Sequence, residues 1–447
     1  MDQNVQISLY TKSKQYSVSS APVSVPRETN VAELNKLVKV LLDESGETTT
    51  YPEFTFLVNN EVLTTTLHDY LSEKQALSET IDIEFCPKQG PPKYEKEYVQ
   101  DDLISCVKRR HKYILTGGYD GTLHIWSIDN KDAVLSMELE EKVKCVEWIS
   151  LDQKENKAVF VTGGFDQTAQ IWSWDMKSNT VDCLAVCRGH SETVMTVAAR
   201  PLSGSDNNPT HFATGSWDGT VKLWSAATES TDLSEETGGI AHIRKSTSKI
   251  PTRIPLFTLA GHRETVTRVC WLTTALTNDG EAKKGGNQLL SVSWDHSLRI
   301  WDCEAAKGNT GAEVRCILSN HALHDADVSS RGVLTASSDN TIRVYDPRAD
   351  APLVLSGFQG HTGWLTSVAW APHRDDQFIS GSIDRSVRLW DTRNPRASLY
   401  DLMGHADMVT DVDWAPAIES SSTGVKSTHY ILSSSADSTI KVYHYPD

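Results

Sequence analysis

An aspartate followed six residues later by tryptophan or tyrosine occurs seven times between residues 120 and 443. The pairs are Asp120/Trp126, Asp166/Trp172, Asp218/Trp224, Asp295/Trp301, Asp339/Tyr345, Asp384/Trp390 and Asp437/Tyr443. Small residues and the aspartate predict a tight turn between two short strands, and the aromatic residue ends the second strand. Successive aspartates lie 46, 52, 77, 44, 45 and 53 residues apart. Such a period predicts propeller blades, and seven blades close into one ring.

The N-terminal part of the chain has a different composition, because all thirteen tryptophans follow residue 125. Val5–Tyr10, Phe54–Val58 and Thr80–Phe85 have the composition of strands, while Val31–Leu42 has apolar residues at helical spacing. Residues 1–85 therefore predict a small α+β domain of the ubiquitin-like, β-grasp type. The fold class as a whole is mainly β.

Residues 86–94, CPKQGPPKY, predict a linker because they are rich in proline and glycine. The propeller is expected over residues 95–447. Each blade needs four strands, but only four residues follow Tyr443, which ends a third strand. We therefore expect Tyr94–Val99 to supply the outer strand of the seventh blade and to cover its open edge.

One insertion within the propeller, at about residues 226–253, changes along its length from acidic and Ser/Thr-rich to basic. It has no apolar periodicity, so the sequence predicts disorder. Its basic half contains Arg244, Lys245, Lys249 and Arg253. We interpret it as an inert loop, with a nuclear signal or an RNA contact as the alternative.

Gly-His pairs precede several blades and predict buried polar networks rather than catalytic triads. The candidate sets are His190/Ser216/Asp218/Trp224, His262/Ser293/Asp295/Trp301 and His361/Ser382/Asp384/Trp390. The constellation recurs with a tryptophan that can donate its indole N–H, and buried polar groups must be satisfied. The sequence contains no unique triad, phosphate-binding glycine loop or metal-ligand cluster. We therefore expect neither enzymatic activity nor a bound cofactor.

Large aromatic residues stand directly before four of the turn aspartates, at Tyr119, Phe165, Trp217 and Trp294. Trp364, near the start of a first strand, is expected on the same face of the ring. Tryptophan and tyrosine are enriched among interface hot spots. These five residues are therefore candidates for partner binding, and the alternative is that they pack against neighbouring blades.

The formal net charge of −16 argues against nucleic acid as the main ligand, because phosphate repels such a chain. We expect direct RNA contact to be weak or none. The eight cysteines include no CxxC pair or zinc-type spacing, which favours a reducing compartment. No apolar run reaches about 18 residues and a signal-peptide pattern is missing. We expect a soluble intracellular protein without a membrane partner.

The combination of a β-grasp domain, a short linker and a seven-bladed WD-repeat propeller resembles the Notchless-like family of ribosome-assembly factors. The motifs that carry the resemblance are LHDYLSEK at 67–74, LSE at 77–79, IEF at 83–85 and PPKY at 91–94, with the long insertion in the third blade. Within that family the chain is most similar to the WD-repeat subunits of the PeBoW complex. The resemblance implies a non-enzymatic role in rRNA processing and pre-ribosome maturation of the large subunit. It also implies a nucleolar and nucleoplasmic location, with the block-of-proliferation WD protein and pescadillo as partners.

The resemblance further implies a site in the ubiquitin-like domain. In the family this domain presents a carboxylate to the metal-ion-dependent adhesion site of midasin, an AAA ATPase, and the matching position is Glu79. Mg²⁺ held by oxygen ligands and water keeps a position for an incoming carboxylate. The metal would belong to the partner, so we expect this chain alone to hold none. Glu73, Asp82 and Glu84 are competing candidates.

Two other functions fit parts of the sequence. Tyr345-Asp346-Pro347-Arg348 and Trp390-Asp391-Thr392-Arg393 match the WDxR pattern of substrate receptors of cullin-type ubiquitin ligases. That function would make Arg348 or Arg393 essential for adaptor binding. A general WD signalling scaffold is the second alternative, but it does not account for the N-terminal domain.

Overall fold

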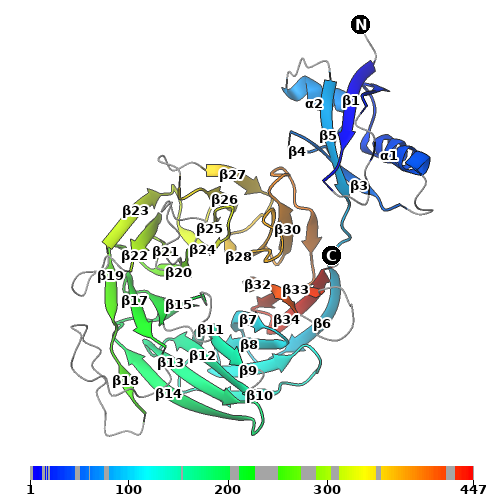
Figure 1. Ribbon diagram of the computed structural model, residues 1–447. Helices are drawn as coiled ribbons and strands as arrows, with labels where there is room; N and C mark the ends of the chain where they lie inside the picture. Colours follow the sequence, from blue (N-terminus) through cyan, green and yellow to red (C-terminus); the bar gives the residue numbers. More distant parts are fainter. Residues whose placement is uncertain are drawn as a thin grey trace. The chain divides into compact units, whose positions relative to one another are not determined.

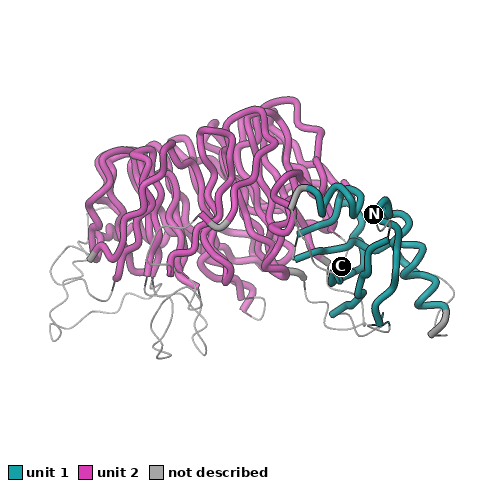
Figure 2. Tube along the Cα trace, turned by 90° about the horizontal axis from the view of Figure 1, so that it is seen from above, with its two compact units in different colours: residues 1–91 teal, residues 92–447 magenta. Residues whose placement is uncertain are grey.

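The computed structural model describes residues 4–12, 16, 18, 21–45, 51–59, 61–74, 80–152, 155–201, 211–226, 250–272, 288–303, 312–348, 354–418 and 428–445. The chain forms two compact units, residues 1–91 and residues 92–447 (Figures 1 and 2). Glu79 and most of the insertion at 226–253 lie outside the described residues.

A mixed five-stranded sheet in the order β2-β1-β5-β3-β4 forms the N-terminal unit. Its elements are β1 (Asn4–Tyr10), β2 (Val23–Pro26), α1 (Val31–Ser45), β3 (Phe54–Val58), β4 (Glu61–Val62), α2 (Leu67–Lys74) and β5 (Thr80–Pro87). The central strands β1 and β5 are parallel, and the other strand pairs are antiparallel. Leu34, Val38 and Leu42 place one face of α1 in the core of this unit, as their helical spacing predicts. The unit has a core of its own and the predicted α+β class.

The segment between the two units is shorter than the predicted linker 86–94. Cys86 and Pro87 belong to β5, where they pair with β3. At the other end, β6 (Lys93–Val99) already begins at Lys93, which pairs with His444. The proline and glycine content predicted where the linker lies. The linker is shorter than predicted because residues at both of its ends pair with neighbouring strands.

Seven sheets, the blades, form the second unit, as predicted (Figure 1), and they are antiparallel except for one parallel pair of strands in blade two. Blade one contains β7 (Ile104–Arg110), β8 (Tyr113–Gly118), β9 (Thr122–Ser127) and β10 (Leu135–Glu138), and blade two contains β11 (Val143–Asp152), β12 (Lys157–Gly164), β13 (Thr168–Asp175), β14 (Thr180–Arg188) and β18 (Thr252–Arg253). Blade three contains β15 (Val194–Ala199), β16 (His211–Ser216), β17 (Thr220–Ser225) and β19 (Phe257–Ala260), and blade four contains β20 (Val266–Trp271), β21 (Gln288–Ser293), β22 (Ser297–Asp302) and β23 (Ala312–Leu318). Blade five contains β24 (Leu323–Val328), β25 (Val333–Ser337), β26 (Thr341–Tyr345) and β27 (Val354–Gln359), and blade six contains β28 (Leu365–Trp370), β29 (Gln377–Ser382), β30 (Val387–Asp391) and β31 (Tyr400–Leu402). Blade seven contains β32 (Val409–Ile418), β33 (Thr428–Ser435), β34 (Thr439–Tyr445) and β6.

The ring closes at blade seven. The first strands of neighbouring blades contact one another all the way round, from β7 through β32 and back to β7. The outer strand of blade seven is β6, which pairs antiparallel with β34 from Val99 opposite Thr439 to Lys93 opposite His444. The expected strand donation from the N-terminal side of the ring is therefore confirmed.

One end of the 226–253 insertion is ordered, which corrects the prediction of disorder for that part. Residues 227–249 lie outside the described residues. Thr252 and Arg253 form β18, which pairs in parallel with Val186 and Cys187 of β14. Backbone pairing at an open sheet edge requires no apolar periodicity, so the sequence pattern did not reveal this strand.

Buried polar networks join the turn to the strands in four blades. In blade three, His190 Nδ1 lies 2.8 Å from Asp218 Oδ2, and its Nε2 lies 2.7 Å from Thr214 Oγ1. The indole N–H of Trp224 donates to the same hydroxyl at 2.8 Å. Equivalent contacts join His262, Asp295, Ser291 and Trp301 in blade four, His361, Asp384, Ser380 and Trp390 in blade six, and His405, Asp437 and Ser433 in blade seven.

The predicted serines Ser216, Ser293 and Ser382 are not the residues that bind the histidines. The network hydroxyl stands two residues earlier in the second strand, because the imidazole and the indole meet at mid-strand rather than at the turn. Ser216 instead donates to the carbonyl oxygen of Glu192 at 3.1 Å and accepts the Asp218 N–H at 3.2 Å. Ser293 and Ser382 likewise bond to backbone groups beside their turns. These three serines hold the turns, and the histidines stabilise the blades.

These networks should make the propeller sensitive to acid. Burial lowers the pKa of His190, although Asp218 opposes the shift, and burial likewise lowers the pKa values of His262 and His405. A histidine with a lowered pKa in the folded state favours the neutral form. Its contribution to stability is therefore present above the unfolded pKa of about 6.5 and is lost as the pH falls below that value.

The measurement is the thermal midpoint between pH 8 and pH 5 for the wild type and for His190→Gln. Glutamine is the matched replacement, because Gln100 occupies the equivalent place in blade one and donates to Thr116 Oγ1 at 2.6 Å. The variant should lose less stability on acidification than the wild type. Parallel pH profiles of the two proteins would contradict the assignment.

Candidate protein-interaction face

The seven turns that carry the aspartates are anchored to one face of the ring. In each blade the N–H of the residue before the aspartate donates to the carbonyl oxygen of the residue before the first strand, at 2.9 to 3.2 Å. Each such residue therefore stands beside the start of an innermost strand. We call this surface the turn face and define it by Tyr119, Phe165, Trp217, Trp294, Ser338, Trp364, Ile383 and Ala436.

Three of the predicted aromatic residues form one cluster across blades one to three. The ring centroids of Tyr119 and Phe165 lie 5.6 Å apart, and those of Phe165 and Trp217 lie 6.2 Å apart, both edge to face. The ammonium groups of Lys142 and Lys144 lie 5.6 and 5.9 Å from the centroid of Tyr119. Trp217 nevertheless keeps 42% of its surface exposed. Partner binding and packing against neighbouring blades are thus compatible roles, since these residues pack across blades and still present an exposed surface.

The other two predicted residues form a second cluster, over blades four to six, around a histidine. Trp294 donates its indole N–H to His324 Nδ1 at 3.2 Å, and the His324 ring stacks on Trp364 with centroids 6.1 Å apart. Trp294 and Trp364 are 37% and 56% exposed. Burial lowers the pKa of His324, so the neutral ring is favoured between the two indoles. Sequence reasoning missed His324, because its role arises only when three blades meet.

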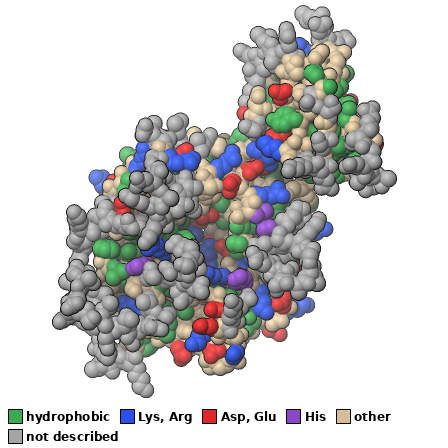
Figure 3. Space-filling view, in the orientation of Figure 1, with side chains coloured by type: hydrophobic (Ala, Val, Ile, Leu, Met, Phe, Trp, Pro, Cys, Tyr) green, Lys and Arg blue, Asp and Glu red, His purple; other side chains and the backbone are tan. Residues whose placement is uncertain are grey.

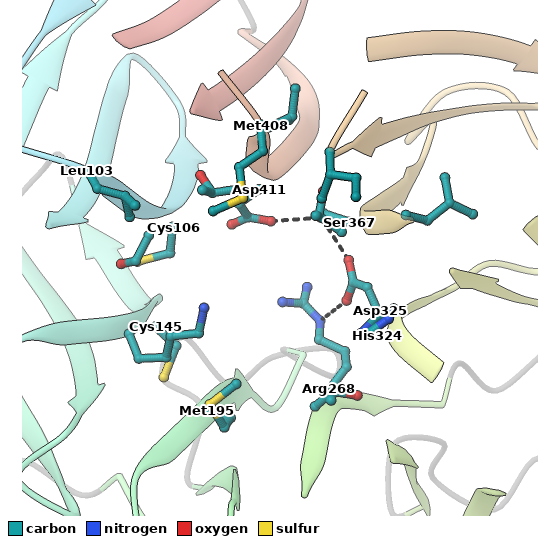
Figure 4. A pocket seen from close by; sticks show the side chains of 18 of the residues that line it. Leu103, Cys106, Cys145, Met195, Arg268, His324, Asp325, Ser367, Met408 and Asp411 are labelled. Atoms are coloured by element: carbon teal, nitrogen blue, oxygen red, sulfur yellow. Dashed lines mark hydrogen bonds and ion pairs between the residues drawn. The ribbon is translucent and has the colours of Figure 1, made fainter. Parts of the chain in front are cut away.

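A cavity of about 250 Å³ opens at the centre of the turn face, with Tyr119, Trp294 and Trp364 among its lining residues (Figure 4). Deeper in the cavity the Ser367 hydroxyl lies 2.7 Å from Asp325 and 2.8 Å from Asp411. These three residues come from blades five, six and seven. They form a polar link between first strands that are far apart in the sequence.

Buried charges of both signs surround this link. Arg268 Nε lies 3.3 Å from Asp325, and Lys108 Nζ lies 3.3 Å from Asp413 and 3.9 Å from Asp411. Burial by itself would lower the pKa values of Lys108 and Arg268, but the neighbouring aspartates raise both above their ordinary values. The paired charges line the cavity between neighbouring first strands (Figure 4), and acidic and basic side chains also lie interspersed on the face of the propeller that Figure 3 shows. The ion pairs thus join β20 to β24 and β7 to β32, which are neighbouring first strands around the cavity.

The two WDxR arginines hold their own turns. Arg348 Nε donates to Asp346 Oδ1 at 2.9 Å, and Arg393 Nη2 donates to Asp391 Oδ2 at 2.7 Å. A third carboxylate, Asp376, lies 3.3 Å from Arg393. Both guanidinium groups therefore have local partners that account for the motif.

Within the part of the chain that the structure describes, no three His, Cys, Asp or Glu side chains gather as a metal site. A search of the same residues for a helix of sufficient length and apolarity to span a bilayer found none.

Comparison with known proteins places both units. The model of the NLE (NUC135) domain matches residues 5–71. Curated relatives named ribosome biogenesis protein WDR12 homolog match almost the whole chain. The relative from Drosophila mojavensis is 35% identical over 443 residues, covering 98% of this chain and 95% of its own length. The relative from Drosophila pseudoobscura pseudoobscura is 36% identical over 445 residues, with the same coverage. The chain belongs to the WDR12 family of WD-repeat ribosome biogenesis proteins.

The family model of the WD-domain repeat matches some blades of this propeller and not others. It covers residues 96–127, 181–225, 253–302, 353–391 and 396–444. The first three strands of blades two and five fall outside these matches. Among solved structures, the WD40 propeller domain of Doa1 has a TM-score of 0.55 at 17% identity, covering 80% of this chain and 97% of that domain. That likeness supports the fold alone.

Proposed function

We propose that this chain is a non-catalytic assembly factor for the large ribosomal subunit, which is held on the pre-ribosome by its propeller and removed through its N-terminal unit. The observation that carries the proposal is the full-length similarity to ribosome biogenesis proteins across both units. A propeller without the N-terminal unit would suit any scaffold, so the pairing of the two units gives the proposal its specificity.

The turn face is the docking surface in this proposal. Its exposed tryptophans, Trp217, Trp294 and Trp364, offer large apolar areas next to paired charges. Such residues are enriched among interface hot spots. By resemblance, the partner is the block-of-proliferation WD protein, which acts with pescadillo in the nucleolus and nucleoplasm.

The N-terminal unit provides the second contact, through Glu79 and the Mg²⁺ ion of the adhesion site of midasin. Of the competing acids in the described residues, Glu84 is buried and forms an ion pair with Lys12 at 2.9 Å, so it is not free to bind a metal. Asp82 is exposed on β5 and serves as a matched control. The ATPase would pull on this contact and strip the chain from the particle.

Two sets of variants should change the amount of this protein on large-subunit precursors in opposite directions. Trp294→Ala with Trp364→Ala removes the docking surface, so the particle-bound fraction should fall. Truncation of one hot-spot tryptophan costs at least about 2 kcal/mol, or about 30-fold in affinity. Glu79→Ala blocks removal, so the bound fraction should rise.

The measurement is sedimentation of cell extracts through a sucrose gradient, with immunodetection of each variant. Val314→Ala, which truncates an exposed residue of β23 away from the turn face, is the control for docking, and Asp82→Asn is the control for release. If Glu79→Ala left the particles as the wild type does, the proposed release step would be wrong. Unchanged binding of the double tryptophan variant would refute the docking surface.

A further inference from the structure

Blade two has no counterpart of the histidine that contacts the turn aspartate in four other blades. In blades three, four, six and seven the network histidine stands four residues before the first residue of the first strand. That first residue pairs with the last or nearly last residue of the second strand. Blade one has Gln100 at this position, and Gln100 bonds to Thr116. In blade two the equivalent residue is Leu139, which packs among apolar neighbours.

Blade two also differs at a second position, where it has a neutral residue and the other blades have a basic one or a histidine. Four residues after the turn aspartate, the other blades carry His124, Lys222, Arg299, Arg343, Arg388 and Lys441. In blade five, where His321 Nε2 lies 3.7 Å from Asp339 Oδ2, Arg343 donates from both terminal nitrogens to Asp339. Blade two has Gln170 there, which donates to Asp166 Oδ2 at 2.9 Å. Among the described residues, Asp166 therefore has no cationic or imidazole partner.

Asp166 accepts fewer hydrogen bonds than the aspartates of the histidine blades. Asp218 accepts from His190, from the N–H of Ser191, and from the N–H and hydroxyl of Thr220. Asp166 accepts from the N–H and hydroxyl of Thr168 and from Gln170. A carboxylate offers about four acceptor sites, so one remains available.

A cavity of about 390 Å³ lies at this place, between blade one and the outer strand of blade two. Its wall includes Thr162, Asp166 and Trp172. The Thr162 hydroxyl is buried and accepts the indole N–H of Trp172 at 3.0 Å. Trp172 is only half-buried, whereas the corresponding aromatic residues of the other six blades are all buried. The cavity thus presents an indole that is more exposed than its counterparts in the other blades, next to a hydroxyl and a carboxylate.

The charge of the cavity favours a cation. Its acidic lining residues are Glu138, Glu140, Glu141 and Asp166, and its basic ones are Lys142 and Arg188, a balance of four negative charges against two positive. The Lys142 ammonium lies over the Tyr119 ring, which belongs to the turn face. Arg188 forms no ion pair with Asp166 among the described contacts.

We propose that this cavity binds an arginine side chain from a partner protein. A planar guanidinium can donate an N–H group to the remaining acceptor site of the carboxylate while it stacks on an indole. Blade five uses the same pairing within the chain, between Arg343 and Asp339. The residues that line this cavity are all different from those that line the central cavity.

The test is a titration of the ¹⁵N-labelled full-length chain with the peptide acetyl-Gly-Arg-Gly-amide, followed by NMR through the indole N–H of Trp172. The resonance is assigned by its loss in Trp172→Phe. The arginine peptide should shift it saturably, and the neutral citrulline peptide should not. The lysine peptide should bind at least about tenfold more weakly, because it lacks the planar fork.

Two variants should abolish the arginine-dependent shift. Asp166→Asn removes the charge, with the exposed Asp182→Asn of the same blade as its control. Leu139→His should fill the cavity as the histidines do elsewhere, and its thermal midpoint should be at least that of the wild type. Equal binding by Leu139→His, or by the citrulline peptide, would overturn the proposal. It would also fail if the peptide bound to Arg244→Ala but not to the wild type, since the occupant would then be this chain's own insertion.

Discussion

A chain that begins at residue 100 should fail to form a stable propeller, whereas one that begins at residue 92 should melt as the intact propeller does. The difference is β6, the outer strand of blade seven. Without it, β34 becomes an unpaired edge that is prone to aggregate. Tyr98 of this strand is 2% exposed, lies 5.0 Å from Trp126 and donates to the carbonyl oxygen of Ser127 at 2.9 Å. The strand therefore joins blade seven to blade one as well as completing a sheet.

A single substitution should reproduce much of this loss. Tyr98→Ala removes a buried aromatic side chain, which costs about 3–5 kcal/mol, a large share of the stability of about 5–15 kcal/mol that is typical of a folded protein. Tyr94→Ala is the matched control on the same strand. Because Tyr94 is 55% exposed, that change should cost less than about 1 kcal/mol.

Urea unfolding of both variants, followed by tryptophan fluorescence, measures the two losses. Similar losses for Tyr98→Ala and Tyr94→Ala would show that β6 does not hold the ring closed. So would equal midpoints for the chains that begin at residues 92 and 100.

The sequence was most informative where a local pattern repeats. The aspartate-aromatic pairs predicted the blades, because each pair belongs to a single turn and its two strands. The donated strand β6 was predicted because the C-terminal sequence supplies only three strands of blade seven. The same turns placed Tyr119 and Trp294 on one face, which the anchoring hydrogen bonds account for.

Features that depend on contacts between distant segments were not predicted. The histidine networks were assigned to Ser216 and its equivalents, because the sequence shows proximity to the turn but not the reach of the imidazole. His324 and the charged floor around Asp411 need several blades to meet. The strand β18 depends on the free edge of β14 rather than on any pattern of its own.

The central claim is that a carboxylate of the N-terminal unit binds the metal site of the ATPase. Glu79 was identified by resemblance, since an acid between a helix and a strand has no local signature of this role. If Glu79 is a metal ligand, its truncation leaves a charged partner unpaired. Losses of about 2–5 kcal/mol are typical of such changes, or at least about 30-fold in affinity.

The most direct measurement is a pull-down of the adhesion-site domain of midasin by residues 1–91, which have a core of their own. The wild type should bind in Mg²⁺ and lose binding in EDTA. Glu79→Ala should not bind under either condition, and Asp82→Asn should bind as the wild type does. Binding that survives both EDTA and Glu79→Ala would contradict the carboxylate–metal contact and the release step that depends on it.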